Sequence, residues 1–176
     1  MNTAAPWAVA THQTPLDQAD AAVWGGKGAG LIRLAGWGFD VPPFFVLGAG
    51  LYREVGPAAT LADLPGPGRE KLLSAVADGL AGLGAGPVAV RSSALDEDGG
   101  AHSLAGQMDS FLNVPATPEA VAEQVLAAWR SLLSDRAVAY RARRGLATDD
   151  LAMDVVVQTM LNAERALVAF SANPLT

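Results

Sequence analysis

The sequence contains no cysteine, and this absence excludes disulfide bonds, thiolate catalysis and cysteine-ligated metals. Histidine is also scarce. The two that are present, His12 and His102, lie far apart along the chain, and neither has a second histidine at metal-site spacing. We therefore expect no zinc site, which leaves carboxylates as the other candidate metal ligands.

Positive charge is in the minority. The 176 residues include 12 Lys and Arg against 18 Asp and Glu, which gives a net charge of −6 and a pI near 4.7. No global positive field is available to hold nucleic acid or an anionic membrane. An anionic ligand would have to be bound by a local arrangement of residues.

Long apolar runs are missing as well. The uncharged segment Val41–Leu51 contains two prolines and is too short to cross a bilayer. The N-terminal segment has no basic residue before its apolar patch, which Pro6 interrupts, so it does not resemble a secretory signal. We expect a soluble, cytoplasmic protein with no membrane partner.

The length allows one domain, or two small lobes that share a core. We expect residues 1–22 to form an N-terminal extension in which Trp7 and Val9 lie on a short edge strand, and residues 23–176 to form the main domain.

The most informative stretch runs from Pro87 to Val114. The β-branched run Val88–Val90 predicts a buried strand that delivers Arg91 to a polar, glycine-rich loop. A guanidinium, small hydroxyls at Ser92 and Ser93, and glycines that allow close backbone approach suit an anionic ligand such as a polyphosphate. The alternative is a surface loop whose arginine pairs with its own acidic neighbours.

A second glycine-rich cluster surrounds Lys27. It precedes an apolar stripe that predicts a short helix ending near Gly36, so Lys27 is expected in a glycine turn at a helix N-terminus. Backbone N–H groups and the helix dipole favour an anion there. The cluster matches neither a Walker A loop nor a dinucleotide fingerprint, and a plain glycine-rich turn remains the alternative.

The remaining segments predict packing elements. We expect a buried strand after Pro42 and Pro43, helices over Gly68–Leu83, from an N-cap at Thr117 and from Asp135 to Gly145, and strands over Leu151–Leu161 and Ala166–Ser171.

Seven clusters together resemble one known family. They are Gly25–Ala29, Val41–Val46, Val88–Ala94 with Glu97 and Asp98, Leu104–Val114, Ala139–Arg141, Val156–Gln158 and Ser171–Pro174. In this order, over roughly residues 23–175, they resemble the nucleotide-binding domain of the phosphoenolpyruvate synthase, pyruvate phosphate dikinase and rifampin phosphotransferase group. The resemblance implies an α+β, ATP-grasp-like fold, with the N-terminal lobe and an incomplete second lobe present in this chain.

The resemblance implies a role for each matching residue. Lys27 and Arg91 would contact the ATP phosphates and neutralise charge on the transferring group. Gly106 and Ser110 match a loop that lies over the phosphates. Gln158, Met160 and Leu161 match the family strand that contacts the adenine ring. Glu97 and Asp98 match a family acidic pair, whose simplest role is to anchor the loop.

The chain departs from the family pattern in three ways. Met108 and Ser110 replace the usual glutamine and threonine, and the span between Pro43 and Arg91 is shorter than expected. The second lobe, whose carboxylates hold Mg²⁺ in relatives, and the phosphohistidine domain lie outside these residues. We therefore expect ATP and those missing parts, in cis or in trans, as partners, and no turnover by the chain alone.

Two functional hypotheses follow. In the first, the chain is the ATP-binding portion of a phosphotransferase of the phosphoenolpyruvate synthase (pyruvate, water dikinase) type, which passes phosphate from ATP through a phosphohistidine to pyruvate or to an antibiotic-like alcohol. In the second, it is a stand-alone remnant that binds nucleotide weakly or binds a partner. A purely structural domain is a third possibility, which rests only on the missing metal site.

Overall fold

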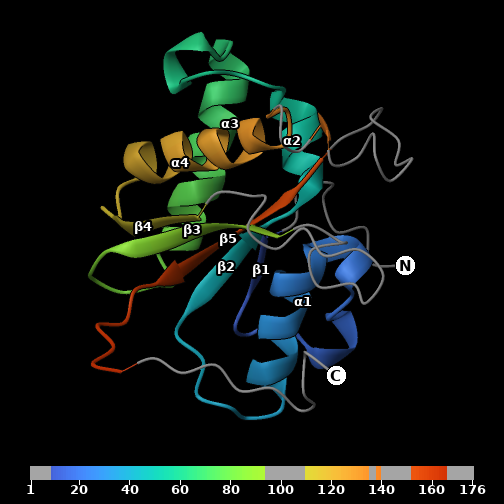
Figure 1. Cartoon of the computed structure of the whole chain (residues 1–176), viewed down its shortest axis with the longest axis vertical. Helices are drawn as coiled ribbons and strands as arrows, with labels where there is room; N and C mark the ends of the chain where they lie inside the picture. Colours follow the sequence, from blue (N-terminus) through green and yellow to red (C-terminus); the bar gives the residue numbers. More distant parts are fainter. Residues whose placement is uncertain (1–8, 94–109, 135–137, 140–151, 166–176) are drawn as a thin grey trace.

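The computed structural model describes residues 9–93, 110–134, 138–139 and 152–165. Within these residues the fold is mixed α/β: one five-stranded antiparallel sheet has helices on both faces (Figure 1). The strands are β1 (Val9–Thr11), β2 (Phe44–Leu47), β3 (Val88–Ser93), β4 (Ser110–Val114) and β5 (Asp154–Thr159). The α-helices are α1 (Ala21–Gly36), α2 (Ala49–Val55), α3 (Gly66–Leu80) and α4 (Pro118–Ser131), and two short 3₁₀ turns span Leu16–Gln18 and Leu61–Asp63.

The sheet order is β1-β2-β5-β3-β4, so the last of the described strands in sequence lies at the centre. β5 pairs antiparallel with β2 on one side and with β3 on the other. Its three consecutive valines, Val155–Val157, are all fully buried. A β-branched run without alternation is typical of a strand that is covered on both faces. The central position of β5 follows from that pattern.

One face of the sheet packs on α2, α3 and α4, which lie together above it in Figure 1. α4 begins as expected, because the Thr117 hydroxyl accepts a hydrogen bond from the Ala120 amide and Pro118 occupies the first turn. Its apolar side is anchored by Trp129, which is 2% exposed and whose ring meets that of Tyr52 edge-on at 5.3 Å between centroids. The Trp129 indole N–H donates to the Met153 carbonyl at 3.0 Å.

Replacing Trp129 by phenylalanine is expected to lower the free energy of unfolding by about 2 kcal/mol, because the variant loses packing and leaves a buried carbonyl without its donor. Trp37→Phe is the matched control, since Trp37 is 61% exposed, and it should change stability by less than about 0.5 kcal/mol. Urea unfolding of both variants measures the difference. Equal losses in the two variants would show that the indole contact does not anchor α4.

The other face packs on α1, which covers β1, β2 and β5. Trp24, Ile32, Val46 and Val156 form the buried cluster between them. α1 begins at Ala21, but Gly25 has non-helical φ and ψ and divides it into two helical segments. The second segment begins in the glycine cluster, so the glycine turn predicted before Lys27 is confirmed, whereas the first segment was not predicted. The first segment begins where it does because Asp20 caps it by accepting a hydrogen bond from the Ala22 amide at 2.8 Å. Gly25 lies at the kink between the two segments.

Other expectations meet the structure as follows. Val9 lies on an edge strand paired with β2, as predicted, whereas Trp7 falls outside the described residues. The strand after Pro43 and the helix near residues 68–83 are confirmed with slightly different ends. The strand predicted over Ala166–Ser171, and all but two residues of the helix predicted from Asp135, lie outside the described residues. No described helix combines the length and apolarity needed to span a membrane.

Candidate functional site

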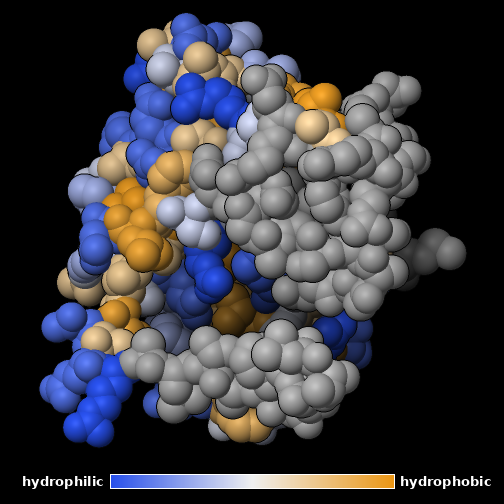
Figure 2. Space-filling model, viewed as in Figure 1, coloured by the Kyte–Doolittle hydropathy of each residue, from blue (hydrophilic) through white to orange (hydrophobic). Residues whose placement is uncertain are grey.

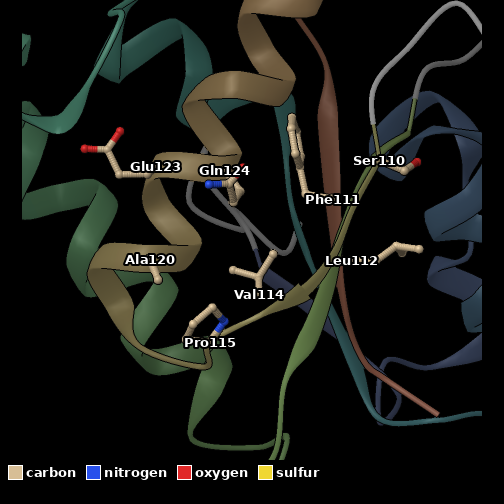
Figure 3. A pocket seen from close by; sticks show the side chains of 8 residues that line it. All are labelled: Ser110, Phe111, Leu112, Val114, Pro115, Ala120, Glu123 and Gln124. Carbon is tan, nitrogen blue, oxygen red and sulfur yellow. The ribbon is translucent and has the colours of Figure 1, made fainter. Parts of the chain in front are cut away.

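A hollow of about 380 Å³ lies on the sheet face that α1 covers only in part. Successive strand residues point to opposite faces. Because Val90 belongs to the core beneath α3 and α4, its neighbours Ala89 and Arg91 leave from the opposite face. Figure 3 shows the same alternation on β4: Phe111 points towards α4, whereas Ser110 and Leu112 point away from it.

This hollow collects five of the residues that the sequence implied for ATP binding, which are Arg91, Ser110, Gln158, Met160 and Leu161. Pro42, Ala89, Leu112 and Thr159 complete its lining. The residues come from segments that are far apart in sequence, and the sheet order alone brings them together. Its volume is within the usual range of pockets for small ligands.

The hollow has a charged region and an apolar region. Arg91 supplies the one charge among its described lining residues, and Ser110 lies directly opposite Arg91 in the β3–β4 register. A guanidinium beside a hydroxyl offers several fixed donors to an oxyanion. Met160 and Leu161 lie on the far side with Pro42, and Leu161 is 64% exposed. An anionic group attached to a flat apolar ring fits such an arrangement.

Hydrogen bonds hold the β5 end of this hollow in place. The Gln158 side chain donates from Nε2 to the Pro42 carbonyl at 3.2 Å, and the Met160 amide donates to the Pro87 carbonyl at 3.0 Å. The Thr159 amide donates to Pro43 at 2.9 Å. A side-chain amide has two N–H donors and a carbonyl acceptor, so the bond to Pro42 fixes Gln158 while using a single donor.

Lys27 lies on α1, just after the kink. Gly25 interrupts the helix with φ +67° and ψ 171°, a conformation that in practice only glycine adopts. The Lys27 Nζ atom is shielded from solvent although the rest of the side chain is partly exposed. The next amide, that of Gly28, donates to the Ser93 hydroxyl at 3.0 Å. The residue after Lys27 is therefore hydrogen-bonded to β3, two residues beyond Arg91.

The sequence context suggested that the hydroxyls of Ser92 and Ser93 could bind a ligand, but in the structure neither is accessible to one. Their side chains are 1% and 0% exposed, and the Ser93 hydroxyl also donates to the Trp24 carbonyl at 3.0 Å. This hydroxyl is used inside the fold. No sequence signal distinguished Ser93 from Ser92, because both are small, polar and adjacent.

A second hollow, of about 620 Å³, lies between β4 and the start of α4 (Figure 3). Apolar atoms gather on this side of the molecule in Figure 2, near the β4 edge. Its carboxylate, Glu123, accepts a hydrogen bond from the Leu61 amide at 3.0 Å and so serves the fold. Among the described residues that line the second hollow there is no cationic group of the kind that a phosphate would need.

Asp154 is a buried carboxyl that sequence reasoning missed. It lies opposite Ser93 in the β3–β5 register and is 6% exposed. Burial raises its pKa from 3.8 to about 7, although the hydrogen bond from the Ala49 amide, at 2.7 Å, and the charge of Arg53 act in the opposite direction. No motif marked Asp154, because its partner Ala49 is distant in sequence.

Several predicted residues lie outside the described part of the chain, namely Gly106, Met108, Glu97, Asp98 and His102. Among the residues that are described, no three His, Asp or Glu side chains gather as a metal site would require.

The chain belongs to the family described as the pyruvate phosphate dikinase AMP/ATP-binding domain, whose model matches residues 62–176. This confirms the resemblance read from the sequence. The matched residues include β3, β4, β5 and the two residues Met160 and Leu161 that follow β5. They therefore contain every described residue of the hollow except Pro42.

Named relatives agree with this family. The chain is 40% identical to the prodigiosin synthesizing transferase PigC of Serratia marcescens over 86% of its length, which is 18% of that protein. It is 32% identical to a probable phosphoenolpyruvate synthase of Methanocaldococcus jannaschii and 34% identical to the rifampicin phosphotransferase of Streptomyces sviceus, in each case over 92% of its length. It spans 16% and 22% of those two proteins.

Proposed function

We propose that this chain binds ATP in the hollow beside α1, as the N-terminal portion of an ATP-grasp domain that spans residues 23–176, with residues 1–22 as an extension. The observation that carries the proposal is that Arg91, Ser110, Gln158, Met160 and Leu161 line one hollow. Arg91, Ser110 and Lys27 would receive the phosphates. Gln158, Met160 and Leu161 would receive the adenine, which polar edge groups and apolar packing suit.

Catalysis in this proposal is a matter of charge and position. Lys27 and Arg91 would neutralise the phosphoryl oxygens, and Gly106, which the family resemblance implies as a phosphate-binding residue, would contribute its backbone N–H. Carboxylates beyond these residues would hold Mg²⁺, which would supply further positive charge to the phosphates. The isolated chain is therefore expected to bind ATP without turning it over, and the remaining half of the clasp and a phosphohistidine domain complete the reaction in cis or in trans.

The complete reaction would be phosphate transfer from ATP through a phosphohistidine, of the phosphoenolpyruvate synthase type. Relatives whose printed names give three different activities share this segment. This supports a division of labour in which the segment supplies the nucleotide site and other parts of the protein select the acceptor. Pyruvate and an antibiotic-like alcohol are both compatible acceptors. A non-catalytic nucleotide-binding or partner-binding remnant is the alternative, and nothing in the hollow favours it.

Replacing Lys27 and Arg91 together by alanine is expected to weaken ATP binding by at least about 10-fold, because two cationic contacts to phosphate are lost. Calorimetric titration with ATP and Mg²⁺ measures this. Arg69→Ala/Lys71→Ala is the matched control. It also removes one arginine and one lysine, but from α3, which lies on the opposite side of the sheet. It should bind ATP as the native chain does.

Two results would contradict the proposal. One is native protein that shows no saturable heat up to millimolar ATP. The other is an equal loss in the two double variants, which would make the effect one of net charge rather than of this hollow.

A further inference from the structure

We propose that Ser93 is a positioning residue for Lys27: its hydroxyl replaces one rung of helix α1 and so sets where Lys27 stands relative to Arg91. The inference rests on the proposed function, because it concerns the placement of a phosphate-binding lysine. It adds a residue to the site that does not itself touch the nucleotide.

The geometry of the kink supports this role. In a regular α-helix the amide of residue i donates to the carbonyl of residue i−4, so Gly28 would donate to Trp24. The chain turns at Gly25 instead, and the Ser93 Oγ stands between the two groups, 3.0 Å from the Gly28 nitrogen and 3.0 Å from the Trp24 oxygen. A side chain inserted into the helical ladder is an established cause of a sharp kink.

The serine satisfies both groups that the kink leaves without helical partners. Its oxygen accepts from Gly28 and its hydrogen is donated to Trp24, which is the full donor and acceptor capacity needed there. Both partners are buried, and Ser93 itself is 0% exposed, so water cannot readily take its place. Loss of the hydroxyl would leave the Gly28 amide and the Trp24 carbonyl without partners, or would let them form the helical hydrogen bond that the kink prevents.

The kink is also locked from the backbone side. A Cβ atom on Gly25 would lie 2.0 Å from the Ser93 carbonyl oxygen, so the two main chains are in direct contact. The second part of α1 therefore has a fixed position on β3. Lys27 lies between the two contacts with Ser93, which are made by Gly25 and Gly28.

Ser93 also relates these contacts to Arg91, because both residues lie on β3. Ser93 and Arg91 are two apart on β3, so their side chains leave from the same face of the sheet. Any closing of the rung at Gly28 would rotate or shift Lys27 against Arg91. The spacing of the two cations would change although neither residue had been altered.

A double-mutant cycle tests this coupling. ATP affinity is measured by calorimetry for the native chain, Ser93→Ala, Lys27→Ala and the combined variant. We expect Ser93→Ala to weaken binding by about fivefold in the native background and by less than about 1.5-fold when Lys27 is already alanine. Ser92→Ala is the matched control, because Ser92 is equally buried on the opposite face of β3, and it should change affinity by less than twofold.

A second measurement does not depend on nucleotide. Amide proton exchange and ¹H–¹⁵N shifts of Lys27 and Gly28 should change in Ser93→Ala and stay as in the native chain in Ser92→Ala. If native protein does not bind ATP, or if Lys27→Ala binds it equally well, the proposed function fails. The NMR measurements on Lys27 and Gly28 then still test whether Ser93 positions Lys27.

The inference is overturned if the effects of Ser93→Ala and Lys27→Ala on affinity are additive. It is overturned equally if the Lys27 and Gly28 amides are unchanged by loss of the Ser93 hydroxyl.

Discussion

Gly25→Ala is expected to lower the free energy of unfolding by about 4 kcal/mol, one of the larger effects available to a single methyl group. The residue has φ +67° and ψ 171°, which is strained for any side chain. The added Cβ would also lie 2.0 Å from the Ser93 carbonyl oxygen and 2.4 Å from its hydroxyl. The obstacle is mainly backbone of a central strand, so it cannot move aside as a flexible side chain would.

Gly30→Ala in the same helix is the matched control. Its Cβ would meet nothing within 4 Å, and its backbone is helical. Because alanine is the better helix former, this variant should gain about 0.5–1 kcal/mol. Denaturant unfolding of the two variants under identical conditions gives the comparison. If both glycines accept alanine with similar changes in stability, the close approach between Gly25 and Ser93 does not exist in solution.

The elements that could be predicted from sequence are those whose cause is local. α4 has its cap at Thr117, a proline in the first turn and apolar residues at helical spacing, so its start and its buried side both follow from a few neighbouring residues. β2 follows two prolines with four residues that are all buried. In each case the signal and its physical reason lie within the same segment.

The elements that could not be predicted depend on distant partners. α2 has only seven residues and no capping side chain of its own, and its first amide is bound by Asp154, from β5. The glycine turn before Lys27 was predicted, but the helical segment that precedes it, Ala21 to the kink at Gly25, was not. Here Ser93 holds the ladder together across the kink, from 65 residues away in sequence.

The candidate site shows the same division. Arg91 at the end of a buried run suggested an anion site from local pattern alone. The structure places Arg91 in the hollow, and the anion site stays a prediction. The residues that join it from β4 and β5 carry no local mark of function. Ser110, Gln158 and Met160 could be named only through the family resemblance, because it is the antiparallel order of the sheet that brings them beside Arg91.

Stability is expected to fall as pH rises through the weakly acidic range, because of Asp154. Burial raises its pKa from 3.8 to about 7 in the folded chain. Between these values the folded state holds a proton that the unfolded state has released, so each increase in pH favours unfolding. The contribution is fully present below the unfolded pKa and is lost as pH approaches the folded pKa. Between about pH 4.5 and 7 the loss amounts to about 3 kcal/mol.

Asp154→Asn isolates this contribution. Asparagine keeps an acceptor oxygen for the Ala49 amide and has the same shape, but it has no proton to lose. The difference in unfolding free energy between native and variant should therefore shift by about 3 kcal/mol over that pH range, towards the variant at higher pH. Asp20→Asn is the matched control, since Asp20 also accepts from a backbone amide but is exposed.

Chemical unfolding at several pH values between 4.5 and 8 measures these differences, and far-UV circular dichroism confirms that each variant is folded at the start. Parallel curves for native protein and Asp154→Asn would mean that the carboxyl is ionised in the folded chain throughout. In that event the bond to Ala49 and the charge of Arg53, both of which lower the pKa, would outweigh burial, and the end of β5 would be open to water. A difference that grows with pH would instead establish a neutral carboxyl, at weakly acidic pH, at the junction of β5 and α2, on the strand pair that also holds Ser93.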